Sequence, residues 1–149
     1  MIVYLDTSAL LKRVVIEDES EALNDYLTAL AEAEQPATLV TSALARVEIA
    51  RRVWRAAEDA AAVVVAVDDA LSGVDTVPLD QCVDDASSLE TRYLRALDAL
   101  HIAASKIINA SVFVTYDKQQ AHSARTEQLT VVMPNRLSPA ESAQPVHDD

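Results

Sequence analysis

The N-terminal stretch MIVYLDTSALLKRV, residues 1–14, contains the feature that decides the fold. Its apolar and aromatic run from Ile2 to Leu5 predicts a short buried strand, which ends at an acid, Asp6. Two hydroxyl residues, Thr7 and Ser8, and then a helical apolar pattern follow. Either one of these three polar residues caps a helix, or Asp6 is a metal ligand. The stretch by itself leaves both interpretations open.

Strand and helix patterns alternate along the rest of the chain. Strand patterns fall on residues 2–5, 38–42, 111–116 and 129–134, with a weaker one on 74–79. Helical patterns fall on residues 9–15, 19–33, 43–54, 56–71, 81–94, 97–108 and 118–126. Strands separated by helices predict an α/β fold with a mostly parallel sheet covered on both faces. We expect one domain over residues 1–134 and a flexible tail over residues 135–149, which are rich in proline and small polar residues.

Composition excludes several classes of function. The 12 basic and 24 acidic residues give a net charge of −12, which argues against a surface that grips nucleic acid over its whole area. A single glycine, Gly73, excludes the glycine-rich phosphate loops of P-loop and Rossmann proteins. A single cysteine, Cys82, excludes an internal disulfide and a cysteine-based metal site. The sequence shows no secretion signal and no apolar run that could span a membrane, so we expect a cytoplasmic protein.

Acidic residues occur at four places where strands end or where helices begin after strands. Asp6 follows the first strand pattern and Asp117 follows the stretch SVFVTY, residues 111–116. Glu48 lies among small and apolar neighbours, and Asp98 lies at the start of an apolar helical pattern. Taken singly, each acid could cap a helix or point into solvent. Because the carboxyl ends of parallel strands meet at one edge of a sheet, Asp6 and Asp117 come together if their strands are neighbours.

A cluster of carboxylates indicates a particular chemistry. The acids repel one another and retain protons unless a cation neutralises them. Oxygen ligands without histidine or cysteine suit Mg²⁺ or Mn²⁺, and such ions support phosphodiester hydrolysis. Thr7, Ser8 and Thr115 could donate hydrogen bonds to an acid or to a metal-bound water, although capping and strand propensity also explain them. His101 lies three residues after Asp98 on one helix, where we expect it to pack or to orient an acid rather than to bind metal.

Four segments carry a resemblance to a known family. In chain order they are IVYLDTSALLKR (residues 2–13), VTSALARVEIAR (40–51), LRALDALHIAAS (94–105) and FVTYDKQQ (113–120). They resemble the acidic motifs of PIN-domain ribonucleases, and in particular those of the VapC-type toxins of bacterial toxin–antitoxin pairs. The likeness extends from Ile2 to Pro134.

The resemblance implies a specific fold, activity and set of partners. The fold would be an α/β/α sandwich with a five-stranded parallel sheet. The activity would be Mg²⁺- or Mn²⁺-dependent cleavage of RNA, with neutralisation by a cognate antitoxin and assembly as a homodimer. The acids that match the family's metal site are Asp6, Glu48, Asp98 and Asp117, of which Asp117 matches the most variable position.

The negative net charge departs from what an RNA-binding enzyme would be expected to carry, and a local basic patch could compensate for it. The basic residues near the acidic motifs that we consider for RNA binding are Lys12, Arg13, Arg46, Arg51 and Lys118. The alternative is that they only solubilise amphipathic helices.

Three other interpretations compete with a metal-dependent nuclease. An aspartyl-phosphate enzyme would need a second acid two residues after Asp6, where Ser8 stands. A response-regulator receiver would need an acid pair after its first strand. The non-enzymatic alternative is an inactive PIN-like module that dimerises or binds an antitoxin.

Overall fold

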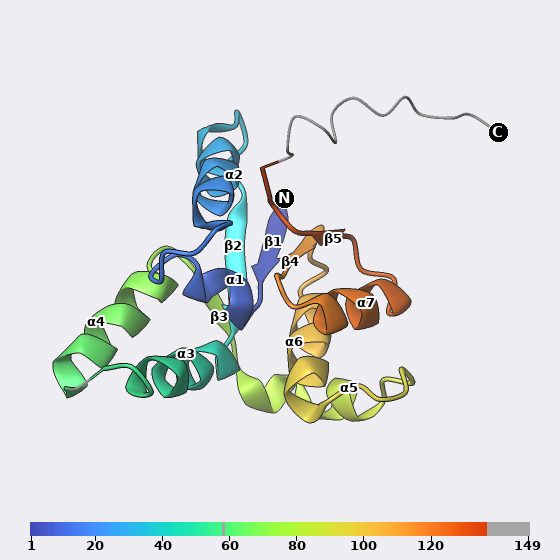
Figure 1. Cartoon of the computed structure of the whole chain (residues 1–149). Coiled ribbons are helices and arrows are strands. Elements are labelled where there is room, and N and C mark those ends of the chain that lie inside the picture. Colours follow the sequence, from blue (N-terminus) through green and yellow to red (C-terminus); the bar gives the residue numbers. More distant parts are fainter. Residues whose placement is uncertain (58, 137–149) are drawn as a thin grey trace.

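The computed structural model describes residues 1–57 and 59–136. One five-stranded sheet with the strand order β3-β2-β1-β4-β5 forms its centre, and every pair of neighbouring strands is parallel (Figure 1). The strands are β1 (Ile2–Leu5), β2 (Thr38–Ser42), β3 (Asp75–Val77), β4 (Val112–Val114) and β5 (Val131–Val132). The predicted α/β class and parallel sheet are confirmed.

Helices cover both faces of the sheet, which gives three layers (Figure 1). They are α1 (Thr7–Leu11), α2 (Ser20–Glu32), α3 (Leu44–Trp54), α4 (Ala60–Leu71), the 3₁₀ turn η1 (Leu79–Gln81), α5 (Val83–Ser87), α6 (Ala96–Ile107) and α7 (Lys118–Thr126). Helices α1 to α4 pack on one face and α6 and α7 on the other. Along the described residues, no helix is both long and apolar enough to cross a membrane.

Alternation along β1 explains why the sheet has a core on each side. Val3 and Leu5 point into one buried cluster, where they pack with apolar side chains of the first four helices. Tyr4 points the opposite way and packs with Phe113 of β4 and Ile102 of α6. All five side chains are fully buried. A strand buried on both faces carries no polar residue until it ends, and in β1 that point is Asp6.

The first helix is shorter and begins earlier than its apolar pattern predicted. Residues 9–15 were expected to be helical, whereas α1 runs from Thr7 to Leu11. Asp6 is its N-cap residue, because the Asp6 side chain accepts a hydrogen bond from the backbone N–H of Ala9. Capping thus shifts the start of the helix to the residue directly after the strand.

The predicted helix over residues 81–94 is wrong over most of its length. Only η1 and α5 are helical there, and the chain leaves the helix after Ser87. The Ser87 and Ser88 hydroxyls donate to the carbonyls of Val83 and Asp84, a local hydrogen bond that competes with helix continuation. Tyr93 has a φ of 64°, in the left-handed region, so the segment before α6 is an irregular loop.

One other predicted helix begins later than expected, and one predicted range falls mostly outside the described residues. The helix expected over residues 56–71 begins at Ala60, where the Asp59 side chain caps it by accepting from the Ala62 N–H, and residue 58 lies outside the described residues. The tail expected over 135–149 also lies mostly outside them, since the description stops at residue 136.

Candidate active site

A cleft of about 390 Å³ lies at the carboxyl edge of the sheet, and all four predicted acids line it. Two acids follow neighbouring strands, since β1 pairs with β4 in the register Tyr4–Phe113. The other two lie in α3 and in the first turn of α6. The complete lining is Asp6, Thr7, Ser8, Leu11, Glu48, Arg95, Ala96, Leu97, Asp98, His101 and Asp117. A larger hollow of about 580 Å³ lies beside α5, α6 and α7, and none of the four acids lines it.

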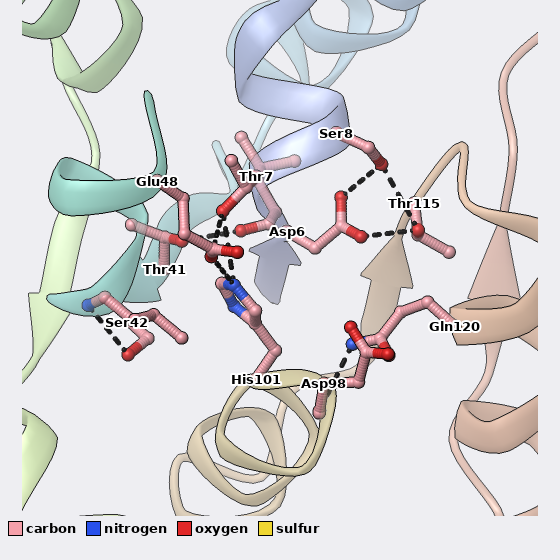
Figure 2. A network of polar contacts seen from close by, with 12 residues as sticks. Asp6, Thr7, Ser8, Thr41, Ser42, Glu48, Asp98, His101, Thr115 and Gln120 are labelled. Atoms are coloured by element: carbon pink, nitrogen blue, oxygen red, sulfur yellow. Dashed lines mark hydrogen bonds and ion pairs between the residues drawn. The ribbon is translucent and has the colours of Figure 1, made fainter. Parts of the chain in front are cut away.

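Asp6 is the most buried of the four acids, with 4% of its surface exposed. Its Oδ1 accepts hydrogen bonds from Ser8 Oγ at 2.6 Å and from the Ala9 N–H at 3.0 Å, and its Oδ2 accepts from Thr115 Oγ1 at 2.5 Å. Figure 2 shows the carboxylate turned toward these two hydroxyls. Burial raises the pKa of Asp6, and the electrostatic effect of His101 and the hydrogen bonds from Ser8 and Thr115 only partly offset that rise.

Glu48 belongs to a second polar network on the other side of Asp6 (Figure 2). Its Oε1 lies 2.6 Å from Thr7 Oγ1, which donates to it, and 2.6 Å from His101 Nε2. His101 is itself almost fully buried, and its Nδ1 lies 2.7 Å from the Tyr4 hydroxyl. Burial alone would raise the pKa of Glu48, but the hydrogen bond and the electrostatic effect of His101 outweigh it and the pKa is lowered. The geometry makes His101 a residue that orients Glu48.

Asp98 and Asp117 share a cation. The guanidinium of Arg95 lies between them, with Nε 2.8 Å from Asp98 Oδ2 and Nη2 3.5 Å from Asp117 Oδ2. The hydrogen bond to Asp98 raises the pKa of Arg95. The other oxygen of Asp117 accepts from the N–H groups of Gln119 and Gln120, so this acid also caps α7.

The chemistry of the lining fits Mg²⁺ or Mn²⁺. The potential ligands are carboxylate and hydroxyl oxygens, the donor type that these hard ions prefer, and no thiol lines the cleft. A nearby divalent cation would also favour the ionised form of buried Asp6. As the side chains stand, however, no three His, Cys, Asp or Glu residues among 1–57 and 59–136 are close enough together to hold one ion. Hydroxyls, His101 and Arg95 hold the acids instead.

The five basic residues considered for RNA binding divide into two groups. Lys12 is nearly buried and pairs with Glu17 and Glu19, both at 2.7 Å, and Arg13 donates to the backbone carbonyls of Ala70 and Ser72. Both therefore have internal partners. The other three are exposed, and of these Arg46 makes a long contact of 3.9 Å with Asp68. These three are Arg46, Arg51 and Lys118.

Three residues near the acids were not among the predicted site residues. Arg95 lines the cleft. Tyr4 was taken as a core residue, and its hydroxyl contact with His101 was not foreseen. Arg52 lines a smaller adjoining hollow together with Lys12 and Asp117. The contacts of Tyr4 and Arg52 join residues far apart in the chain and leave no signal in the sequence, whereas Arg95 and Asp98 are three residues apart, a spacing that can indicate an ion pair.

Comparison with known proteins identifies the family of this chain. A family model described as the PIN domain matches residues 3–125, and the chain belongs to the PIN-domain family. Within it, the chain is similar to Ribonuclease VapC35 of Mycobacterium tuberculosis, with 33% identity over 139 residues that cover 90% of this chain and 98% of that protein. Ribonuclease VapC46 of the same species is 35% identical over 136 residues, covering 89% of this chain and 98% of that protein.

Solved structures show the same fold. The structure of VapBC2 from Rickettsia felis, bound to a DNA fragment from their promoter, matches with a TM-score of 0.70 at 18% identity, over 89% of this chain and 98% of that chain. The structure of PAE2754 from Pyrobaculum aerophilum matches with a TM-score of 0.54, also at 18% identity, over 88% of this chain and 83% of that chain. The predicted PIN-like sandwich is thereby confirmed.

Proposed function

We propose that this chain is a Mg²⁺- or Mn²⁺-dependent endoribonuclease that acts as the toxin of a toxin–antitoxin pair. The observation that carries the proposal is the convergence of four acids, from four separate parts of the sequence, on one cleft. The ribonuclease names of the VapC relatives, which match nearly the whole chain, support RNA as the substrate.

In this proposal Asp6, Glu48, Asp98 and Asp117 hold the metal ion. When bound, the ion supplies a more acidic water as nucleophile and neutralises charge on the phosphate. The protein's own contribution is positioning. Ser8 and Thr115 fix the direction of the Asp6 carboxylate, while Thr7 and His101 fix that of Glu48.

RNA would approach over exposed basic residues of α3 and α7, the helices that follow β2 and β4. Arg46, Arg51 and Lys118 are exposed and available to phosphates, and Arg52 extends the basic lining into the adjoining hollow. The internal contacts of Lys12 and Arg13 give those two a structural role in this proposal.

The direct test is RNA cleavage by the purified protein without its antitoxin. We expect cleavage with Mg²⁺ or Mn²⁺ and none with EDTA. Asp6→Asn should reduce kcat/KM by roughly 10²-fold or more, as removal of a metal ligand does. Asp25→Asn is the matched control, because Asp25 is exposed on α2 outside the cleft. Full activity of Asp6→Asn would refute the catalytic assignment.

The alternative function is an inactive PIN-like module that only dimerises or binds an antitoxin. Growth distinguishes the two proposals. Overproduction of an active toxin should arrest cells, overproduction of Asp6→Asn should not, and co-expression of the antitoxin should relieve the arrest. If the wild-type chain and Asp6→Asn affect growth equally, the module is favoured.

We also propose two protein partners, a cognate antitoxin and a second copy of this chain. The VapC names of the relatives and the similar structure of VapBC2 motivate the first. Exposed apolar side chains on α3 and α4, including Trp54, Val64 and Val65, supply surface that a partner could cover. Light scattering of the purified chain, with and without the antitoxin, measures both assemblies.

A further inference from the structure

The positively charged guanidinium of Arg95 lies between two of the four acids. Arg95 is the residue directly before α6, and its guanidinium reaches Asp98 on that helix and Asp117 after β4. The two acids come from different elements, so this contact joins the two sides of the cleft. Among the described residues that line the cleft, Arg95 is the only lysine or arginine.

The contact occupies carboxylate oxygens of two of the four acids that we propose as metal ligands. Arg95 approaches Oδ2 of Asp98 and Oδ2 of Asp117, while Oδ1 of Asp117 is already held by the N-terminus of α7. An ion bound by both acids would have to compete with the guanidinium for Oδ2 of Asp117, because the other oxygen of that acid is already held. Two positive groups cannot share that space without strong repulsion.

We propose that Arg95 is a built-in counter-ion that competes with the divalent metal for Asp98 and Asp117. This inference rests on the proposed metal-dependent function. Arg95 neutralises the two acids when no ion is bound and leaves when the ion binds. Its side chain is 59% exposed, so it can rotate into solvent without opening the core, whereas Asp98 is only 18% exposed.

The proposal accounts for the arrangement of the acids. No three acidic or histidine side chains among the described residues are close enough to hold an ion as they stand, although four acids line one cleft. Release of Arg95 frees two of those acids to turn toward Asp6 and Glu48. The metal-binding arrangement is therefore formed by exchange of one cation for another.

The test is direct Mn²⁺ binding, measured by calorimetry or by the electron paramagnetic resonance signal of free Mn²⁺, with no RNA present. Arg95→Gln should bind Mn²⁺ roughly three- to tenfold more tightly than the wild type, because two exposed ion pairs no longer compete. Arg92→Gln is the matched control, since it removes the same charge from an exposed residue of the same loop. It should change the affinity by less than about twofold.

Each outcome decides the matter. One informative case is that the wild type binds Mn²⁺ and Asp98→Asn does not. Unchanged or weaker Mn²⁺ binding by Arg95→Gln then overturns the role of Arg95 and leaves the proposed function intact. Equal tightening by Arg95→Gln and Arg92→Gln also overturns it, because the effect would then come from net charge. If the folded wild type binds no Mn²⁺, the proposed metal-dependent function fails, and the counter-ion role fails with it.

Discussion

Asp6 does two jobs, and the chemistry of the two is compatible. Its backbone continues the β1–β4 ladder, with the Asp6 N–H donating to the Val114 carbonyl at 3.1 Å. Its side chain caps α1 and also lines the cleft. A carboxylate has two oxygens with room for several donors, so capping does not exhaust it. The capping interpretation of the opening stretch is confirmed, and the metal-ligand interpretation stays a proposal that capping does not exclude.

Burial of Asp6 makes a prediction about stability against pH. The pKa of Asp6 is raised in the folded state, so ionisation of its carboxyl group destabilises the fold. This destabilisation is absent below the unfolded pKa of about 3.9 and is fully present above the raised folded pKa. Without metal, the stability of the wild type should therefore fall relative to Asp6→Asn as pH rises through that window. Urea unfolding of both proteins from pH 3 to pH 8, in EDTA, measures the difference. A constant difference across the range would contradict it.

Tyr4 makes a prediction about the support of Glu48. Tyr4→Phe removes the hydroxyl that contacts His101 Nδ1 and leaves that nitrogen buried without its partner. We expect a loss of roughly 1–3 kcal/mol in unfolding free energy and weaker RNA cleavage, since His101 no longer holds Glu48 in one direction. Tyr26→Phe, at a half-buried tyrosine in α2, is the control and should change neither quantity. Wild-type stability and activity in Tyr4→Phe would refute this support.

At the scale of elements, the loop between α5 and α6 ends at Arg95 and so positions both Arg95 and the first turn of α6, which carries Asp98. A small polar cluster attaches this loop to the neighbouring helices. Glu127, directly after α7, accepts a hydrogen bond from Thr91 at 2.6 Å and pairs with Lys106 of α6 at 2.9 Å. The loop is therefore tied to two helices, although it has no regular structure of its own.

The Glu127 cluster should stabilise the fold in a pH-dependent way. Hydrogen bonds from Thr91 and Lys106 lower the pKa of Glu127, so its contribution is present above the unfolded pKa of about 4.3 and is lost as pH falls through the folded value. Glu127→Gln should lose roughly 1 kcal/mol at pH 7. The difference from wild type should vanish at pH 2–3, as measured by denaturant unfolding.

Glu32→Gln, an exposed residue at the end of α2, is the control for that experiment. It should match the wild type at both pH values. If Glu127→Gln is as stable as wild type at pH 7, the cluster does not hold the loop.

At the scale of the whole molecule, net charge shapes the choice of partner. A chain with 12 basic and 24 acidic residues repels RNA at long range and attracts a basic protein. The proposed binding of RNA would then depend on exposed basic residues of the elements that carry the acids. Binding of a basic antitoxin would gain from the overall field.

The proposed antitoxin complex should accordingly weaken with salt. We expect its Kd to rise by about tenfold or more between 50 mM and 500 mM NaCl, because screening shortens the reach of the −12 charge. If a basic antitoxin side chain enters the acidic cleft, Asp6→Asn and Asp98→Asn should reduce the salt dependence of this Kd. Titration calorimetry at several salt concentrations measures it, and affinity indifferent to both substitutions would exclude cleft binding.

The sequence alone determined the fold class, most element positions and the four candidate site acids. These follow from local properties. A short apolar run rich in β-branched and aromatic residues, such as Ile2–Leu5, favours a buried strand, and an acid directly after it then lies at the carboxyl end of that strand. The helix prediction failed at residues 88–94. There the hydrogen bonds of two serine hydroxyls and the left-handed backbone of Tyr93 end the helix, although the composition favours one.

Only the tertiary structure decided which side chains hold the acids. Strand order brings Thr115 to Asp6, the packing of α6 on the sheet brings His101 between Tyr4 and Glu48, and the loop before α6 brings Arg95 to Asp98 and Asp117. Most of these contacts join residues that are far apart in the chain. Their partners are set by side-chain direction across packed layers, which local sequence patterns do not encode.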